Sequence, residues 1–299
     1  MDNASRKMFI DICGELGIKC TLLSKDWVFM LEKDGITRFF VGSKSPLNNY
    51  TVGEIIDDKY ALYCILKEKG LPVVEYNIVY CENNHNDFAI DCNSIEYVKD
   101  YFYNNNQDIV LKPCRGTCGR DVYRIKDIQK LEQTYNMLTS KYYSISMSPF
   151  YHIKNEYRFI VLDNEIRISY KKDNPVVYGD GKHTIRELLF RFNRDYFFDI
   201  LDDSFYDRIL DVDEKYEYNW KHNLALGSIS SEIKDKNLYD KLASIAISAA
   251  KEIGLRFGSI DIVVTEDDEY LIMEINSGVM LYNKTRPLYK EVILKMFNS

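Results

Sequence analysis

Two carboxylates interrupt apolar sequence near the end of the chain, one in SIDIVV and the other in YLIMEI. The acidic stretch Glu266–Glu269 between these runs predicts a β-hairpin. If its turn is symmetric, Thr265 pairs with Tyr270. Counting back from that pair places Asp261 opposite Glu274. Directly opposed carboxylates repel each other, so this arrangement needs a positive counter-ion.

A third oxygen donor follows in the same strand. Asn276 lies two residues after Glu274, so both side chains point to one face of the sheet. Carboxylate oxygens are ligands that Mg²⁺ prefers, and nucleotide phosphates often complete its shell. A solvent-facing strand with incidental acids is the alternative. We expect a metal site at Asp261, Glu274 and Asn276, because the two acids interrupt β-branched runs rather than belong to a polar face.

A nucleotide site also needs cations and backbone donors, and IVLKPCRGTCGRDVYRI contains both. Lys112 ends an apolar strand, and Gly116 and Gly119 follow in a short loop. Glycines let backbone N–H groups approach phosphate oxygens closely. The order differs from the GxxxxGK[ST] P-loop, because the lysine precedes the glycines. A simple surface turn explains the same residues about as well.

Other charged residues stand at positions that suggest partners. Lys59 begins a predicted helix, where the macrodipole does not favour a cation, so either an anion binds there or the lysine is simply solvated. Glu156 and Arg158 alternate in a strand and share one face, as part of a site or as a surface ion pair. The histidines lack metal-ligand spacing, and nothing supports a catalytic triad.

These residues fall on a mixture of predicted helices and strands. The periodicity predicts helices over 9–16, 59–70, 184–191 and 238–253. Strands are predicted over 27–31, 38–41, 109–112, 156–163 and 165–170, the last two joined by a turn at Asp163–Asn164. Strands and helices do not alternate strictly, which favours an α+β fold. The Asp- and Tyr-rich stretch 195–218 is interpreted as an excursion or lid.

The composition excludes several classes of protein. With 39 basic and 46 acidic residues, the net charge of −7 gives no global attraction for nucleic acid. No apolar stretch reaches the roughly 18 residues of a membrane span, and the N-terminal sequence does not predict a signal peptide. Seven cysteines without a CxxC pair fit a reducing compartment. A cytoplasmic globular protein is expected, with homodimer formation left open.

Taken in their order along the chain, these motifs resemble those of the ATP-grasp superfamily. The resemblance is strongest to the ATP-grasp module of cyanophycin synthetases and bifunctional glutathione synthetases. The resemblance covers nearly the whole chain. It rests on YTVGEIIDDKYALYCILKEKGLPV, LKPCRGTCGRDV, EYRFIVLD, VVYGDGKHTIRELL and DIVV…MEIN. It implies an α+β ATP-grasp fold with a short N-terminal region over 1–55, an N-terminal lobe over 56–148 and a C-terminal lobe with the metal site over 149–299.

The resemblance also implies an activity. Such enzymes use ATP and Mg²⁺, or Mn²⁺ in its place, to phosphorylate a carboxylate, and an amine then attacks the acyl phosphate to form an amide. The substrate would be an amino acid, a peptide or a small carboxylic acid. Phosphoryl transfer depends on positioning and charge neutralisation, which fits the lack of a catalytic triad. A catalytically weak ATP-binding sensor or scaffold, and a peptide-modifying ligase, remain as alternatives.

Residue roles follow from the same resemblance. It implies nucleotide binding by Lys59, Lys112, Gly116, Gly119 and Glu156, stabilisation of the acyl phosphate by Arg158 and Lys172, metal binding by Asp261, Glu274 and Asn276, and substrate binding by Asn223, Ser277 and Arg286. Three features depart from the family pattern. Lys172 stands where relatives usually carry Arg, and the usual acidic residue before the EYR strand has no counterpart near Ser148–Phe150. The run Asn276-Ser277-Gly278-Val279-Met280 replaces the usual Asn-x-x-Pro-Gly.

Overall fold

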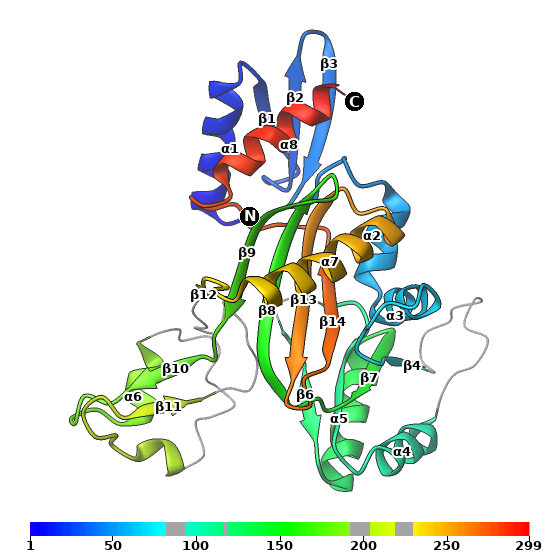
Figure 1. The fold of residues 1–299 in the computed structure, drawn as a ribbon, viewed down its shortest axis with the longest axis vertical. Coiled ribbons are helices and arrows are strands. Elements are labelled where there is room, and N and C mark those ends of the chain that lie inside the picture. Colours follow the sequence, from blue (N-terminus) through cyan, green and yellow to red (C-terminus); the bar gives the residue numbers. More distant parts are fainter. Residues whose placement is uncertain (82–93, 117–118, 192–203, 219–229, 299) are drawn as a thin grey trace.

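The computed structural model describes residues 1–81, 94–116, 119–191, 204–218 and 230–298. Within these ranges the strands form four sheets, and Figure 1 shows the large sheet at the centre with the other three around it. Helices and antiparallel strand pairs are mixed, as the predicted α+β class requires. None of the described helices is both long and apolar enough to cross a membrane.

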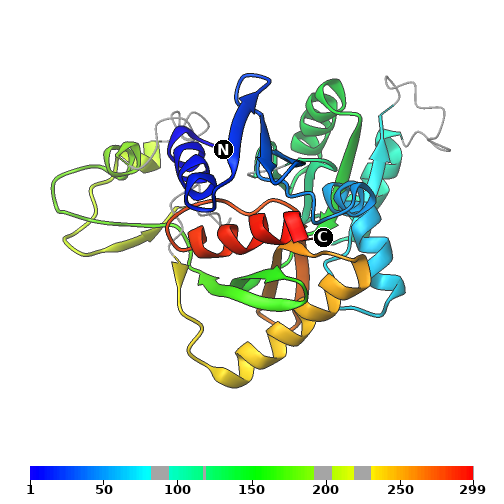
Figure 2. The same cartoon turned by 90° about the horizontal axis from the view of Figure 1, so that it is seen from above.

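The two ends of the chain share one N-terminal unit, at the top of Figure 1. It comprises α1 (Asn3–Glu15), β1 (Lys19–Leu23), β2 (Val28–Lys33), β3 (Ile36–Val41) and α8 (Arg286–Asn298). Asp2 caps α1 by accepting a hydrogen bond of 2.7 Å from the Ser5 N–H. Rings of Phe9, Phe40 and Tyr289 pack together in its core, which joins α8 to α1 and the sheet. Seen from above, α8 in red lies beside α1 in blue (Figure 2).

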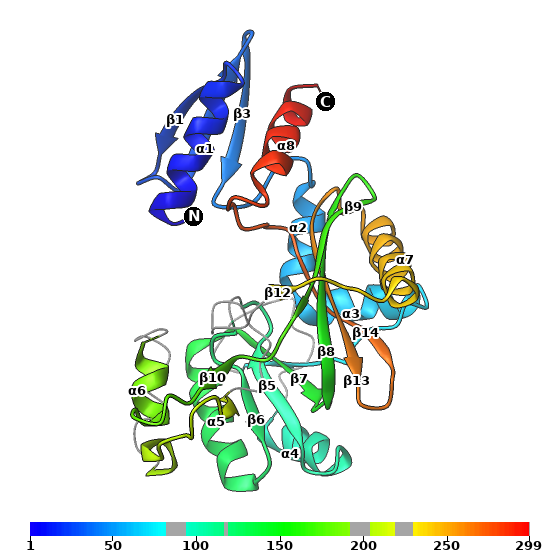
Figure 3. The same cartoon turned by 60° about the vertical axis from the view of Figure 1, so that its left-hand side comes forward.

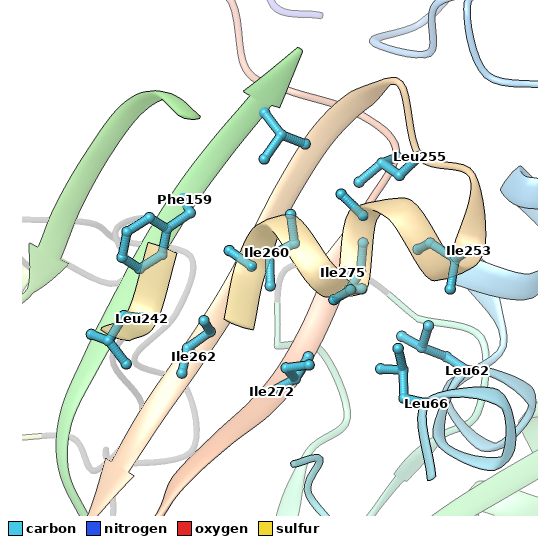
Figure 4. Close-up of a cluster of buried hydrophobic side chains, with 14 of the residues drawn as sticks. Leu62, Leu66, Phe159, Leu242, Ile253, Leu255, Ile260, Ile262, Ile272 and Ile275 are labelled. Atoms are coloured by element: carbon cyan, nitrogen blue, oxygen red, sulfur yellow. The ribbon is translucent and has the colours of Figure 1, made fainter. Parts of the chain in front are cut away.

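Two helices connect this unit to the rest of the molecule. They are α2 (Tyr50–Asp57) and α3 (Lys59–Glu68). Asn49 and Asp58 cap them, each accepting hydrogen bonds from backbone N–H groups of the first turn. Leu62 and Leu66 of α3 are buried against the helix and strands of the large sheet (Figure 4).

A small lobe follows, built on a four-stranded sheet in the order β4-β7-β5-β6. Its elements are β4 (Asn77–Tyr80), α4 (Ile95–Asn104), β5 (Ile109–Pro113), β6 (Tyr123–Ile125), α5 (Ile128–Lys141) and β7 (Ser144–Pro149). The predicted strand over 109–112 is confirmed as β5. Its central position in the sheet buries Ile109 and Leu111, while Lys112 lies at its C-terminal end.

The large sheet has the order β12-β9-β8-β13-β14. Its elements are β8 (Ile153–Leu162), β9 (Glu165–Lys172), β12 (Ser230–Ser231), β13 (Phe257–Thr265) and β14 (Tyr270–Asn276), with α7 (Lys236–Ile253) across one face. The predicted turn at Asp163–Asn164 is confirmed, and both residues have positive φ, as a type I′ hairpin turn requires.

One face of the large sheet is apolar and the other carries the polar residues of interest. Ile260 and Ile262 alternate with Asp261 in β13, and both isoleucines pack under α7 together with Phe159 (Figure 4). Because side chains alternate along a strand, Asp261 points to the opposite face. Figure 3 shows α7 on one side of β8 and β13, with the small lobe beyond the other side.

A further small unit projects beside the large sheet. It comprises β10 (Val176–Tyr178), α6 (Ile185–Phe190), the short helix η3 (Ser204–Asp207) and β11 (Lys215–Glu217). The predicted helix over 184–191 is confirmed, with Thr184 and Glu187 forming a capping box. Part of the predicted excursion over 195–218 lies outside the described residues, and the described part, which includes Leu210, packs against Leu188 of α6.

The buried clusters do not follow the predicted boundaries at 55/56 and 148/149. Helix α3 belongs by packing to the core of the large sheet, and α8 belongs to the core of the N-terminal unit. The small lobe has its own core, formed by residues between 79 and 147. Segments that are distant in sequence therefore share cores, which a division of the chain into consecutive ranges does not express.

Candidate active site

The two carboxylates of the hairpin lie opposite each other, as predicted, but the turn differs from the expected one. Val264, not Thr265, pairs with Tyr270, so the turn end is shifted by one residue. A β-bulge at Met273 adds one residue to β14 and brings Asp261 back opposite Glu274. Asn276 pairs with Ser259 farther along the same strands, which places its side chain on the same face.

Asp261 is enclosed by cations. Its carboxylate accepts hydrogen bonds of 2.6 and 2.5 Å from Nε and Nη2 of Arg158, and a third of 2.8 Å from Nζ of Lys172. Only 2% of the residue is exposed. Burial raises the pKa of Asp261, but Arg158 and Lys172 outweigh it and hold the pKa at about 2. Asp261 is therefore ionised, and its charge is compensated inside the protein.

Lys172 connects this pair to Glu156. The Lys172 ammonium donates to the Glu156 carboxylate, and the two residues lie opposite each other on β9 and β8. Both are buried, with Lys172 only 4% exposed. Burial lowers the pKa of Lys172, and the neighbouring carboxylates raise it above its ordinary value. Glu156 and Arg158 do share a face, but each pairs with a different residue, so the surface ion pair between them is excluded.

Lys59 lies on the other side of the site, at the start of α3. It is only 9% exposed, so the solvated alternative is wrong. Its ammonium donates to the carbonyl oxygens of Cys114 and Gly116, at 3.4 and 3.1 Å. It also lies 3.6 Å from Oε1 of Glu274. This ion pair brings the start of α3, the glycine-containing loop and the large sheet together at one point.

The loop after β5 is attached to helices α2 and α3. The Cys114 thiol donates to Asp58 Oδ1 at 3.2 Å, and burial raises the pKa of Cys114 to about 11. Arg115 donates to Glu54 at 2.8 Å. Gly116 is exposed, and Gly119 has a positive φ of 68°, as a tight turn in this loop requires. Residues 117–118 between these glycines lie outside the described ranges.

Lys112 points to Tyr76, at the hinge where the chain crosses from the edge of the large sheet into the sheet of the small lobe. Its ammonium donates to the Tyr76 hydroxyl at 2.9 Å and lies 4.5 Å from the centre of the Tyr76 ring. Burial lowers the pKa of Lys112, while Glu274 and Glu156 oppose that effect. The two lysines predicted for nucleotide binding therefore both lie within electrostatic reach of Glu274.

The segment after Asn276 is tightly packed. Ser277 is 4% exposed, and its hydroxyl has no hydrogen-bond partner among the described residues. A Cβ atom on Gly278 would lie 2.3 Å from Oγ of Ser43, so a larger residue at this close contact with the N-terminal unit would force one of the two to move.

Two predicted substrate residues are not part of this cluster as described. Arg286 begins α8, and its guanidinium pairs with Glu15 of α1 through hydrogen bonds of 3.2 and 2.6 Å. That contact joins two helices of the N-terminal unit, so the structure gives Arg286 a local partner away from the carboxylates. Asn223 lies outside the described residues.

The oxygen donors fit a hard divalent cation. Two carboxylates and an amide share one face, and Glu274, with its side chain 33% exposed, is the accessible acid. Asp261 would share its oxygens with Arg158 and Lys172. Among the described residues, no group of three His, Cys, Asp or Glu side chains gathers for a metal. A site here therefore depends on Asn276 and on other ligands, such as phosphate oxygens.

Tyr76 is the site residue that sequence reasoning missed. It precedes β4 in a segment without helical or strand periodicity, and nothing in the local pattern distinguishes it among the 24 tyrosines of the chain. Its contacts with Lys112 and Met273 join residues far apart in sequence. The arrangement as a whole places two lysines and a glycine-containing loop against an oxygen-donor face.

The C-terminal part of the chain matches a known domain. A family model of the RimK-like ATP-grasp domain matches residues 212–299, which include the hairpin with Asp261, Glu274 and Asn276. The curated cyanophycin synthetase of Trichormus variabilis is 28% identical over 144 residues, 48% of this chain and 14% of that protein. The chain thus spans only a small part of this relative.

Solved structures show the same fold over most of the chain. The bifunctional glutathione synthetase from Pasteurella multocida aligns with a TM-score of 0.56 at 17% identity, over 98% of this chain and 43% of that one. The D-alanine–D-alanine ligase from Bacillus anthracis aligns with a TM-score of 0.57 at 13% identity, over 86% and 70%. The two comparisons agree: residues 212–299 match the RimK-like ATP-grasp domain, and most of the chain has the fold of these ligase structures.

Proposed function

We propose that the protein is an ATP- and Mg²⁺-dependent carboxylate–amine ligase. The observation that carries the proposal is the 3.6 Å ion pair between Lys59 and Glu274. It brings a cation beside the glycine-containing loop into contact with the oxygen-donor face of the large sheet. A triphosphate with its metal needs this combination of cations, backbone donors and carboxylates.

The reaction would proceed in two steps. A substrate carboxylate takes the terminal phosphoryl group of ATP, which releases ADP and leaves an acyl phosphate. An amine then attacks the acyl carbon, and the amide forms as phosphate leaves. Neither step needs a protein nucleophile, because positioning and charge neutralisation supply most of the catalysis.

The described residues would divide these tasks. Lys59 and Lys112 would neutralise phosphate oxygens, and backbone donors near Gly116 and Gly119 would hold the phosphates. Glu274 and Asn276, with Asp261, would hold Mg²⁺, which supplies charge neutralisation when bound. The Nε–Nη2 edge of Arg158 is occupied by Asp261, so its Nη1 group remains to contact an acyl phosphate.

Lys172 and Glu156 have different roles in this proposal. Lys172 is buried against Glu156 and Asp261, so it would position Asp261 rather than touch the acyl phosphate. Glu156 would act through Lys172 instead of contacting the nucleotide. Ser277 is retained as a substrate residue, because its buried hydroxyl can still donate a hydrogen bond.

The test is a trapping experiment. Purified protein is incubated with ATP, Mg²⁺, hydroxylamine and a panel of amino acids, peptides and small carboxylic acids. An acyl phosphate reacts with hydroxylamine to give a hydroxamate, so its carboxylate substrate is identified together with ADP release. Failure of the protein to bind Mg·ATP in calorimetry would overturn the proposal.

A catalytically weak ATP-binding module is the second candidate. The observation in its favour is that Arg158 and Lys172 already neutralise Asp261, one of the three oxygen donors. Such a module would bind Mg·ATP in calorimetry but release no ADP with any member of the panel. The trapping experiment therefore separates the two functions.

A further inference from the structure

Tyr76 lies where the two sheets of the site meet. The segment before it runs along the edge of the large sheet, where Val74 N–H donates to Ile272 O at 3.0 Å and Ile272 N–H donates to Pro72 O at 2.8 Å. The chain then enters β4 of the small lobe directly after Tyr76. The tyrosine is therefore held to one sheet by its preceding residues and leads into the other.

The hydroxyl of Tyr76 contacts both sides of the site. It accepts a hydrogen bond of 2.9 Å from Nζ of Lys112 and donates one of 3.1 Å to the carbonyl oxygen of Met273. A phenol can do both at once, because it has one donor and acceptor lone pairs. The side chain is 4% exposed, and burial raises its pKa, so the donor proton is retained.

Both partners of the Tyr76 hydroxyl belong to the candidate active site. Met273 is the extra residue of the bulge, and its carbonyl immediately precedes Glu274. Lys112 is half-buried, and burial lowers the pKa of its ammonium, so the charged form depends on nearby hydrogen-bond acceptors. One hydroxyl thus links a lysine of the small lobe to the backbone that presents Glu274.

We infer that Tyr76 is a positioning residue that sets the orientation of Lys112 relative to Glu274 across the hinge. The inference rests on the proposed function, because it concerns how the triphosphate of ATP binds Lys112 and the metal-binding face at the same time. Without the hydroxyl, Lys112 keeps its contact with the aromatic ring but loses an acceptor, and the bulge loses a donor.

The test is a double-mutant cycle on Mg·ATP affinity, measured by calorimetry with the full chain. The variants are Tyr76→Phe, Lys112→Met and the combination. We expect Tyr76→Phe to weaken binding roughly 10-fold, as for loss of a hydrogen bond to a charged group. Because Tyr76 acts through Lys112, the double variant should bind within about twofold of Lys112→Met alone.

Tyr151→Phe is the matched control. Its hydroxyl accepts from the Glu75 N–H at 3.2 Å near the same hinge but has no contact with Lys112 among the described residues. It should leave Mg·ATP affinity unchanged. Additive losses in the cycle, or a Tyr76→Phe affinity within twofold of the unmodified protein, would overturn the inference alone. Absence of Mg·ATP binding by the unmodified protein would overturn both the inference and the proposed function.

Discussion

Arg158 and Asp261 lie opposite each other on β8 and β13 and share two hydrogen bonds, of 2.6 and 2.5 Å. On its other side, Asp261 faces Glu274 of β14. One carboxylate therefore stands between a guanidinium and a second carboxylate. The pair explains how two acids can lie opposite each other in a mostly apolar hairpin, because Arg158 and Lys172 compensate the inner one.

The first prediction concerns the stability of this buried network. Lys172→Met would remove the ammonium that pairs with the buried carboxylates of Glu156 and Asp261, and it should lower the free energy of unfolding by about 3–5 kcal/mol. Chemical denaturation measures the loss. Lys44→Met breaks an exposed pair with Asp57 and should cost no more than about 1 kcal/mol. Equal effects of the two variants would contradict a structural role for Lys172.

Glu274 should matter for activity far more than for stability. Glu274→Gln keeps the size of the side chain but removes the charge that Mg²⁺ would need, so ADP release should fall by at least about 100-fold. Its free energy of unfolding should change by less than about 1 kcal/mol, because the side chain is 33% exposed and its ion pair is long. Glu266→Gln, in the exposed turn of the same hairpin, is the control. Unchanged ADP release in Glu274→Gln would rule out its metal role.

Lys59 should contribute mainly to nucleotide affinity. Lys59→Met removes a buried ammonium at the start of α3, so Mg·ATP should bind about 10- to 100-fold more weakly, as for loss of charge-assisted hydrogen bonds. Lys67→Met changes an exposed lysine of the same helix and should have no effect on affinity. Calorimetric titration of both variants gives the comparison. Similar affinities would mean that Lys59 does not bind phosphate.

The contact between Gly278 and Ser43 predicts a rescue. Gly278→Ala places a methyl group 2.3 Å from the Ser43 hydroxyl, so either this side chain or the loop after Asn276 must shift. The variant should lose about 1–3 kcal/mol of stability, as overpacking does. Combining it with Ser43→Gly removes the clashing atoms and should restore much of the loss in thermal unfolding. A double variant no better than Gly278→Ala would show that the strain lies elsewhere.

The stability that Glu15 of α1 gains from its ion pairs with Arg286 and Lys290 of α8 should depend on pH. Arg286 and Lys290 lower the pKa of Glu15 to about 2, from an ordinary value of 4.5. A lowered carboxyl pKa stabilises the folded state above the ordinary value, and that contribution is lost as the pH falls from 4.5 toward 2. Glu15→Gln should therefore lower the thermal midpoint near pH 7 but not near pH 2. A difference that persists at pH 2 would contradict the assignment.

Local patterns in the sequence determined a large part of this protein. Counting back from the turn of the C-terminal hairpin predicted that Asp261 faces Glu274, and apolar periodicity predicted a helix that begins at Lys59, which the structure caps with Asp58. Both predictions rest on short-range effects, because hairpin pairing and helical periodicity depend on residues close in sequence. The hairpin pairing was nevertheless only partly right. The turn is shifted, and the bulge at Met273 restores the predicted pair.

The tertiary structure alone decided which partners these residues have. Arg158 and Asp261 are 103 positions apart in sequence, and Tyr76 and Met273 are 197 apart. Such contacts arise from strand order and from the meeting of two lobes, which no local periodicity encodes. The same reason applies to α8, which returns to the N-terminal unit. The sequence by itself determined the types of residue that the site contains, whereas packing between distant segments decided which charges are neutralised and which remain available to a ligand.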